Sequence, residues 1–195
     1  SKEIQNGTSL TEITQKVSKI WNINSKILPM SNHSVKTIIE SDIGTLSFQE
    51  YFVKKKCTPK VETITFKNKK AKTSQTVLDE MNDKNLTAIV FAPSNPYLSI
   101  DPILSLSKIK TFLHTSSTPV IAVSPVVDGQ AIKGPTTKIM TELGLKPSAV
   151  TIAKHYDGLI DGLILDVLDQ SLVSQVEDMG IRTKVMNTVM HNDQD

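Results

Sequence analysis

Two stretches of the sequence combine residue types that could hold a phosphorylated ligand. The first runs from Pro93 to Ser99, and the second runs from Ser124 to Gly134. In the second, Lys133 and Gly134 precede Pro135, and proline is favoured at the first helical position. Free backbone amides at a helix start, beside an ammonium group and the Thr136 hydroxyl, suit a phosphate. A loop that satisfies its own backbone and a plain glycine cap remain the alternatives.

A comparison of two helix starts favours the second stretch. Asp101 precedes Pro102 and is predicted to cap the helix beginning there, so its carboxylate would occupy the place of an anion. No acidic residue stands at Gly134 or Pro135. If the protein binds phosphate at a helix end, the start at Pro135 is therefore the better candidate.

The elements that must position these loops follow from residue 74 onward. Apolar strands alternate with amphipathic helices, which indicates a mostly parallel sheet covered on both faces. Ligands bind beyond the carboxyl ends of such strands, and this rule selects the two loops. We predict strands at 88–92, 120–123, 149–153, 163–165 and 181–186, the first two adjacent and parallel, and helices at 76–81, 102–113, 135–143 and 168–179.

The first third of the chain is less regular. A helix is predicted from Ser9 to Trp21, because Ser9 and Glu12 form a capping box and apolar residues share one face. Further along we predict strands at 27–28, 35–39, 46–48 and 61–66, turns at 41–44 and 67–69, and a short helix at 48–55.

Composition limits the class of protein. A chain of 195 residues suits one α/β domain, and a net charge of +2 does not favour nucleic acid as a partner. The lysine runs near 54–56 and 67–72 are interpreted as solvated faces. The single cysteine, Cys57, excludes an internal disulfide and fits a reducing compartment. Since no apolar stretch reaches membrane length, we expect no membrane partner and a cytoplasmic location.

The remaining reactive residues give weaker signals. The histidines lack the spacing of a metal site or a catalytic triad, and no Walker A, GxGxxG or CxxC sequence occurs. Asp161 and Asp166 are predicted to cap turns, and a structural role is favoured for His155. The histidines concerned are His33, His114, His155 and His191. From residues alone, the prediction is an α/β domain that binds a phosphorylated ligand.

Nine short segments, in order and spacing, resemble the 2-phospho-L-lactate transferase family from about residue 9 to 190. Each segment alone is weak evidence for the family, but nine segments in the same order and spacing are specific evidence. One departure is Asp128, where the family commonly has a second glycine before Gly129. The segments are ILPMS at 27–31, FQEYFV at 48–53, APSNP at 92–96, SIDPIL at 99–104, AVSPVV at 122–127, KGPT at 133–136, AKHY at 153–156, DGLILD at 161–166 and GIRT at 180–183.

The resemblance implies a fold and a set of substrate-binding residues. The fold would be α/β, with a Rossmann-like, mostly parallel sheet, helices on both faces and a small α+β excursion. Residues 1–195 would form a single domain, and 27–72 a small subdomain or lid. The two loops would line the substrate cleft through Ser94, Asn95, Pro96, Ser124, Pro125, Lys133, Gly134, Pro135 and Thr136.

The resemblance also implies a reaction. Family members transfer a phospholactyl or phosphoenolpyruvyl group from a guanosine diphosphate donor to the terminal ribityl hydroxyl of the deazaflavin Fo, releasing GMP, in coenzyme F-420 biosynthesis. Magnesium would neutralise the phosphates. The resemblance assigns no catalytic residue in this chain, and a homo-oligomer is possible.

One expectation concerns the missing start of the family pattern. The family begins with a strand and a glycine-rich phosphate turn, followed by an acidic segment that resembles its metal site, and the chain contains neither. We therefore expect the C-terminal part of the enzyme, with no metal ligands of its own and doubtful activity alone. The alternatives are a sugar-nucleotide-binding regulator of a related family and a non-catalytic structural fragment.

Overall fold

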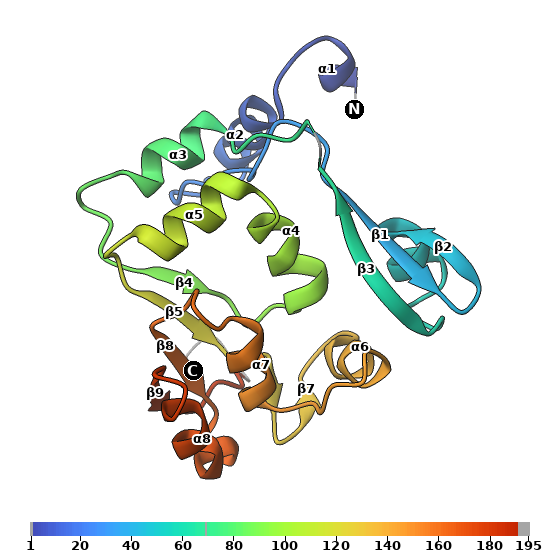
Figure 1. Cartoon of the computed structure of the whole chain (residues 1–195). Helices are drawn as coiled ribbons and strands as arrows, with labels where there is room; N and C mark the ends of the chain where they lie inside the picture. The colour runs from blue at the N-terminus through green and yellow to red at the C-terminus, as the bar shows by residue number, and fades with distance from the viewer. Residues whose placement is uncertain (1, 69, 191–195) are drawn as a thin grey trace.

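The protein has a mixed α/β fold, seen in a computed structural model that describes residues 2–68 and 70–190 (Figure 1). Residues 69 and 191 to 195 lie outside the described part, so the turn predicted at 67–69 is described only in part and His191 not at all. The strands form a three-stranded antiparallel sheet, a four-stranded parallel sheet and a two-stranded hairpin.

The parallel sheet carries the carboxyl-end loops. Its strands are β4 (Ile89–Phe91), β5 (Val120–Val123), β8 (Gly162–Leu165) and β9 (Arg182–Val185), in the order β4-β5-β8-β9. The prediction that the first two are adjacent and parallel is confirmed, with Val90 opposite Ile121. The four strands therefore end at one edge of the sheet.

Helices pack against this sheet, and the predicted α/β class with a mostly parallel sheet is confirmed. Buried residues of three of them, such as Leu113, Ile152 and Val176, share one core with Val120 and Leu163 of the sheet. The helical segments after β3 are α3 (Gln75–Met81), the π-helical turn η2 (Pro96–Ile100), α4 (Asp101–Leu104), α5 (Ser107–Thr115), α6 (Thr136–Glu142), α7 (Ala149–His155), the 3-10 turn η3 (Val167–Leu172) and α8 (Val173–Glu177).

Residues 36–67 form a small unit of their own. It contains β1 (Lys36–Ser41), β2 (Gly44–Ser47), the π-helical turn η1 (Glu50–Lys54) and β3 (Val61–Lys67). The sheet order is β2-β1-β3, and Ile39, Tyr51 and Val61 are completely buried at its centre. Figure 1 shows it beside α6, away from β8 and β9. The lid role of 27–72 stays a prediction.

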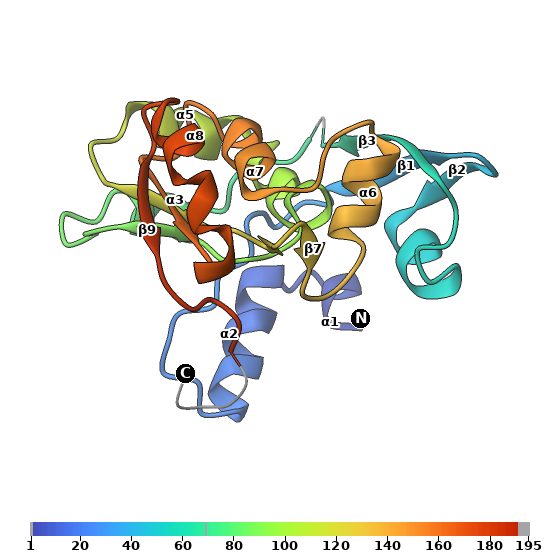
Figure 2. The ribbon, with the colours of Figure 1, turned by 90° about the horizontal axis from the view of Figure 1, so that it is seen from below.

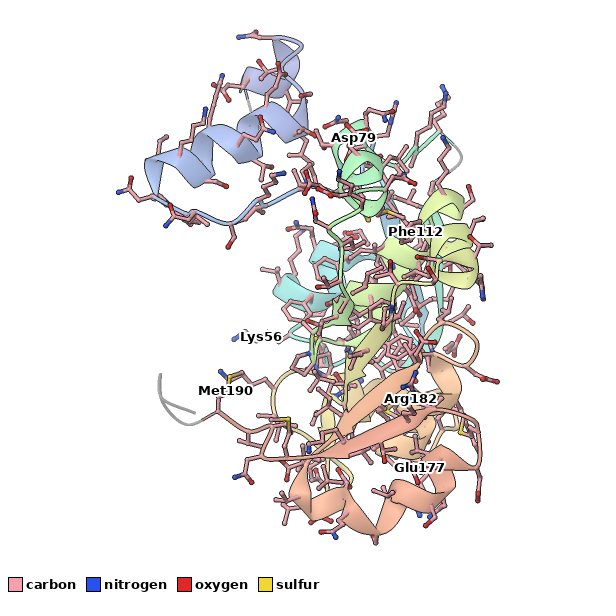
Figure 3. All side chains as sticks on the ribbon, turned by 90° about the vertical axis from the view of Figure 1, so that its left-hand side faces the viewer. Lys56, Asp79, Phe112, Glu177, Arg182 and Met190 are labelled. Atoms are coloured by element: carbon pink, nitrogen blue, oxygen red, sulfur yellow. The ribbon has the colours of Figure 1, made fainter. Side chains whose placement is uncertain are left out.

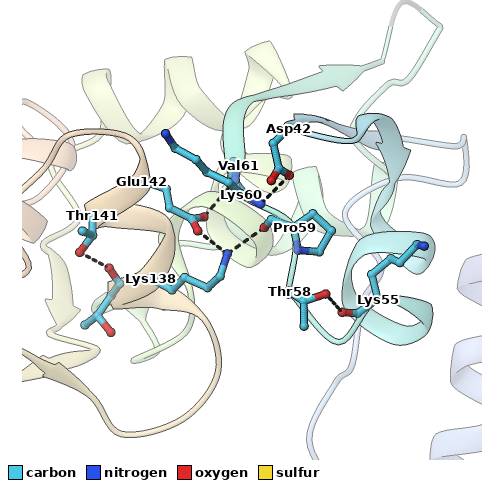
Figure 4. A network of polar contacts seen from close by, with 10 residues as sticks. Asp42, Lys55, Thr58, Pro59, Lys60, Val61, Lys138, Thr141 and Glu142 are labelled. Atoms are coloured by element: carbon cyan, nitrogen blue, oxygen red, sulfur yellow. Dashed lines mark hydrogen bonds and ion pairs between the residues drawn. The ribbon is translucent and has the colours of Figure 1, made fainter.

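A polar junction joins this small unit to α6 (Figure 4). The Lys138 ammonium donates to the Pro59 carbonyl at 2.8 Å and pairs with Glu142, one turn along the same helix. The other carboxylate oxygen of Glu142 accepts the Val61 amide at 3.0 Å. The start of β3 is thereby fixed to α6.

The N-terminal part contains α1 (Lys2–Gln5) and α2 (Leu10–Ile20). The predicted capping box is present, since the Ser9 hydroxyl accepts the Glu12 amide and the Glu12 carboxylate accepts the Ser9 amide. After β5 the chain forms a hairpin, β6 (Val126–Val127) and β7 (Gln130–Ala131), that leads into α6. No helix in residues 2–68 and 70–190 is long and apolar enough to cross a membrane.

Three predicted elements were wrong. The run 149–153 is helix α7 rather than a strand, because the Ser148 hydroxyl accepts the Thr151 amide and starts a helix; a short apolar run fits either structure. Residues 27–28 have no strand partner among the described residues. The single helix predicted at 102–113 is two helices, because Leu106 is buried with an extended backbone between them.

Candidate functional site

The loops that follow β4, β5 and β8 meet at the carboxyl edge of the parallel sheet. This is a consequence of topology, because neighbouring parallel strands end on the same side. The two loops singled out in the sequence are the first two of these, and the third begins at Asp166. The edge is therefore the candidate site.

In the loop after β4, Asn95 organises the backbone. Its side-chain oxygen accepts the Leu98 amide at 2.9 Å and caps η2, with Pro96 at the first position of the turn. The Asn95 amide nitrogen and the Tyr97 hydroxyl are buried without a hydrogen-bond partner among the described residues. Ser94 is half-buried and lines an apolar cavity on the side of β4 that faces away from β5. This loop thus retains unused polar groups.

The loop after β5 is closed on itself at its start. The Ser124 hydroxyl donates to the Val126 carbonyl at 2.8 Å and accepts the Val126 amide at 3.2 Å, and the side chain is buried. Pro125 is buried beside it. Ser124 therefore shapes the turn into the β6–β7 hairpin, and its hydroxyl is already occupied.

The stretch from 133 to 136 reaches solvent at the start of α6. Lys133 and Gly134 are exposed, whereas Thr136 is buried. Gly134 has a φ of 72°, a backbone conformation that favours glycine. Pro135 takes the cap position, so the helix begins at Thr136, one residue after the predicted start, and Pro135 makes no side-chain capping bond. Lys133 is thus available to a ligand at a helix start without an acidic residue in its first turn.

The departure at Asp128 has a backbone explanation. Asp128 has a φ of 48°, in the region that glycine adopts freely and that aspartate tolerates better than most residues. Its amide donates to both carboxylate oxygens of Asp169, each at 3.3 Å. The hairpin turn is therefore anchored to η3, while the Asp128 side chain is exposed.

Two buried carboxylates follow β8. Although burial acts to raise the pKa of Asp166, hydrogen bonds from Thr188 and the Leu168 amide hold that pKa below its usual value. Burial raises the pKa of Asp169, and the charges of Asp128 and Asp166 add to this effect. Asp166 caps η3, as predicted for it, and Asp161 accepts the Val120 amide at the other end of the sheet.

Asp101 and His155 form a partly exposed carboxylate–imidazole pair at this edge. The two side chains meet at 2.9 Å, and each is about one fifth exposed (23% and 22%). The rings of Tyr97 and Tyr156 lie edge-on to the imidazole, with centroids at 4.9 and 5.1 Å. Tyr156 also packs on Phe91, the last residue of β4, which places the pair above the carboxyl end of that strand.

The sequence did not predict this pair. Asp101 was expected to cap a helix, but the α4 cap is Ile100 and the Asp101 carboxylate turns to His155 instead. The residues are 54 positions apart, and the run before His155 was predicted as a strand. The sequence features that could have indicated the pair are Asp101 before Pro102 and His155 before Tyr156.

A metal site is not evident in the part of the chain that the structure describes. No group of three or more histidine, cysteine, aspartate or glutamate side chains is placed to hold a metal ion there. The paired carboxylates of Asp166 and Asp169 are engaged with backbone amides. These residues do not provide the ligand set that magnesium requires.

Comparisons with known proteins agree in pointing to one family. The family model described as 2-phospho-L-lactate transferase CofD matches residues 1–193. The chain is 34% identical over 192 residues to the 2-phospho-L-lactate transferase of Methanosarcina barkeri, covering 97% of this chain and 60% of that protein. It is 30% identical over 190 residues to the phosphoenolpyruvate transferase of Streptomyces griseus, covering 94% of this chain and 59% of that protein.

A solved structure shares the fold. A Bacillus halodurans protein described as a member of the UPF0052 family aligns with a TM-score of 0.64 at 17% identity, over 99% of this chain and 65% of that one. Thus the chain spans about three fifths of the length of the curated relatives it matches.

Proposed function

This chain belongs to the family of the 2-phospho-L-lactate transferase CofD, and on that premise we propose that it forms the acceptor-binding part of a phospholactyl- or phosphoenolpyruvyl-transferring enzyme of coenzyme F-420 biosynthesis. The acceptor is the deazaflavin Fo, and the donor is a guanosine diphosphate carrying the lactyl or enolpyruvyl group. The observation that carries this proposal is the Asp101–His155 pair, at the edge where the carboxyl-end loops converge.

The reaction requires a base and a leaving group. The terminal ribityl hydroxyl attacks the phosphorus that bears the transferred group, a new phosphorus–oxygen bond forms, and the bond to the GMP oxygen breaks. His155 accepts the hydroxyl proton, because its imidazole is partly exposed and held by a carboxylate. Asp101 orients the ring and stabilises the imidazolium that forms.

The substrate contacts are divided between the two loops. The buried Asn95 amide and Tyr97 hydroxyl provide polar groups beside the base. Lys133, exposed at the acid-free start of α6, attracts the donor phosphates. Magnesium is an expectation from the family, and its ligands are not assigned to any described residue.

Binding measurements test the proposal. The chain is titrated with Fo, with a guanine nucleotide and with a uridine sugar nucleotide by isothermal titration calorimetry. The proposal predicts binding of Fo and no binding of the uridine sugar nucleotide. Preference for the uridine sugar nucleotide would indicate the regulator alternative, and binding of none of the three would indicate a structural unit.

A further inference from the structure

The two faces of the parallel sheet are unequally covered. Side chains alternate between faces along a strand, and one face is packed against helices, with Phe91, Ala122 and Leu163 in neighbouring register positions and all buried. On the other face, Val90 is 61% exposed and its register neighbour Ile121 is only half-buried. We call this second surface the open face; its residues are Val90, Ile121, Val123, Gly162, Ile164, Arg182 and Lys184.

An uncovered apolar face is unusual for a parallel sheet. Such sheets occur almost only where both faces are covered, and their strands are apolar on both sides for this reason. The β-branched residues of the open face fit that pattern, since a solvated face would carry polar residues at Val90, Ile121 and Ile164. A hollow on it, with a volume of about 360 Å³, is lined in part by Ile121 and Ile164.

Strand β4 also has a free edge. Among the described residues, β4 pairs only with β5. The Ile89 amide donates to the Pro119 carbonyl at 2.8 Å and thus points toward β5, so the Val90 amide points to the other side. That side borders a largely apolar cavity of about 580 Å³, which Ile89, Met81 and Phe112 help to line.

Helix α2 presents a second apolar surface. Its predicted apolar stripe is turned to solvent: Val17 is 40%, Trp21 72% and Ile20 75% exposed. The opposite side holds the helix in place, where the Thr11 amide and hydroxyl both donate to Asn32 at 2.9 Å. Figure 2 shows α2 on the side of the sheet opposite to α5 and α8, and Figure 3 shows it opposite Phe112 and Glu177. Helix α2 and the open face thus lie on the same side of the sheet.

The lengths of the relatives indicate what covers this side. The chain matches 60% of the Methanosarcina barkeri protein, and 65% of the Bacillus halodurans protein shares its fold. We propose that the open face, the free edge of β4 and the stripe of α2 form one docking surface for the region that these proteins have and the match does not include. That region adds a strand beside β4, parallel to it, and helices over the open face.

A fusion protein tests this directly. The unmatched region of the Methanosarcina barkeri protein is joined to this chain through a flexible glycine-serine linker, and hydrogen exchange is compared between the fusion and the chain alone. We expect the Val90 amide to exchange at least 10-fold more slowly in the fusion, because a new strand accepts its hydrogen bond. The Ile89 amide, already bonded to Pro119, is the internal reference.

Matched substitutions separate docking from general stabilisation. Val90 and Val53 are both 61% exposed valines, but Val53 lies on η1, outside the docking surface. With the two parts as separate polypeptides, Val90→Glu should weaken their association at least 10-fold and Val53→Glu should not, as measured by calorimetry. A Val90 amide that exchanges equally fast in chain and fusion would overturn the proposal. So would equal effects of the two substitutions, or a dimer of this chain alone that Val90→Glu disrupts.

Discussion

Individual polar groups at the carboxyl edge of the sheet differ in how much of their hydrogen-bonding capacity is already used. The Ser124 hydroxyl and the Asp166 carboxylate are buried and engaged with backbone groups. Asp101 and His155 engage each other and remain partly open to solvent. Reactivity is therefore expected at the pair, and a structural role at Ser124 and Asp166.

His155→Ala should reduce the rate of transfer about 100-fold while changing the KM for Fo little, because a positioned base acts in the transition state. The measurement is GMP release from the guanosine diphosphate donor in the fusion described above. Added imidazole should restore part of the rate, which the loss of a merely structural side chain would not allow. His114→Ala, on the exposed side of α5, is the control. An equal loss in both variants, or no imidazole rescue, would contradict the role of His155.

Lys133→Ala should weaken guanine-nucleotide binding about 5-fold, or ~1 kcal/mol, because an exposed ammonium contributes modestly to phosphate binding. Calorimetry at low ionic strength is the appropriate measurement, since screening is then small. Lys146→Ala removes another exposed lysine, beyond the far end of α6, and should leave the affinity unchanged. Identical affinities for wild type and Lys133→Ala would exclude the lysine from the site.

Asp166→Asn should cost about 1–3 kcal/mol of unfolding free energy at pH 7, because a buried carboxylate that accepts three hydrogen bonds loses them in part. The folded-state pKa of Asp166 is lowered, so its stabilisation is complete above the ordinary pKa of an aspartate and is lost as the pH falls toward the lowered value. Urea unfolding between pH 3 and 7 should show the gap between wild type and variant closing as the pH falls.

For Asp169→Asn we expect the stability difference from wild type to change with pH in the opposite direction. Because the folded-state pKa of Asp169 is raised, its charge destabilises the fold once the pH exceeds the unfolded value. The variant should therefore gain stability relative to wild type as the pH rises from 3 to 7. Parallel pH dependences for the two variants would refute both assignments.

At the scale of elements, the junction between β3 and α6 ties the small unit to the remainder of the fold. Glu142→Gln should destabilise this junction by about 0.5–1.5 kcal/mol, because a charge-assisted pairing with Lys138 becomes a neutral one. Hydrogen exchange of the Val61 amide, whose acceptor is Glu142, should become about 2- to 10-fold faster. The exposed Lys26–Glu80 pair is the control, and Glu80→Gln should leave that amide unchanged. Unchanged exchange in Glu142→Gln would mean that the junction does not restrain β3.

Periodicity predicted the elements well where it was unambiguous. The strand at 120–123 and the capped helix α2 are as expected, because an apolar run bounded by turns and a capping box are local signals. The strand prediction for 149–153 failed because a short, mostly apolar run of five residues fits a helix or a strand, and the Ser148 cap decides for the helix. The break at Leu106 reflects burial in the tertiary core, which no local pattern contains.

The same limit applies to the site. Parallel topology placed the loops at 94–96 and 124–125 at one edge, so their position could be predicted from sequence. The Asp101–His155 pair depends on α4 and α7 approaching each other, and the prediction of a strand before His155 concealed this approach. The hydrogen bond from the Ser124 hydroxyl to the Val126 carbonyl likewise depends on a turn geometry that the amino-acid composition does not specify.

At the scale of the whole molecule, the chain combines a carboxyl edge with reactive groups and an apolar side of the sheet that is open. The chain matches about three fifths of the length of its relatives. We therefore expect the transfer reaction to require a protein of the relatives' full length, and we expect this chain to bind the acceptor. An aromatic acceptor depends on apolar walls and a few polar contacts; the rings of Tyr97 and Tyr156 and the unpaired polar groups of the loop after β4 lie beside His155.

The binding of Fo at the carboxyl edge is the central claim, and an amide NMR titration of the chain with Fo tests it most directly. We predict chemical-shift changes concentrated at residues 94–98 and 153–156, with the same dissociation constant with and without magnesium. His155→Ala should keep a similar dissociation constant and lose only part of the shift changes at 153–156, and His114→Ala should leave the whole pattern unchanged. Shift changes confined to other regions, such as the small unit at 36–67, or binding that requires magnesium, would contradict the account.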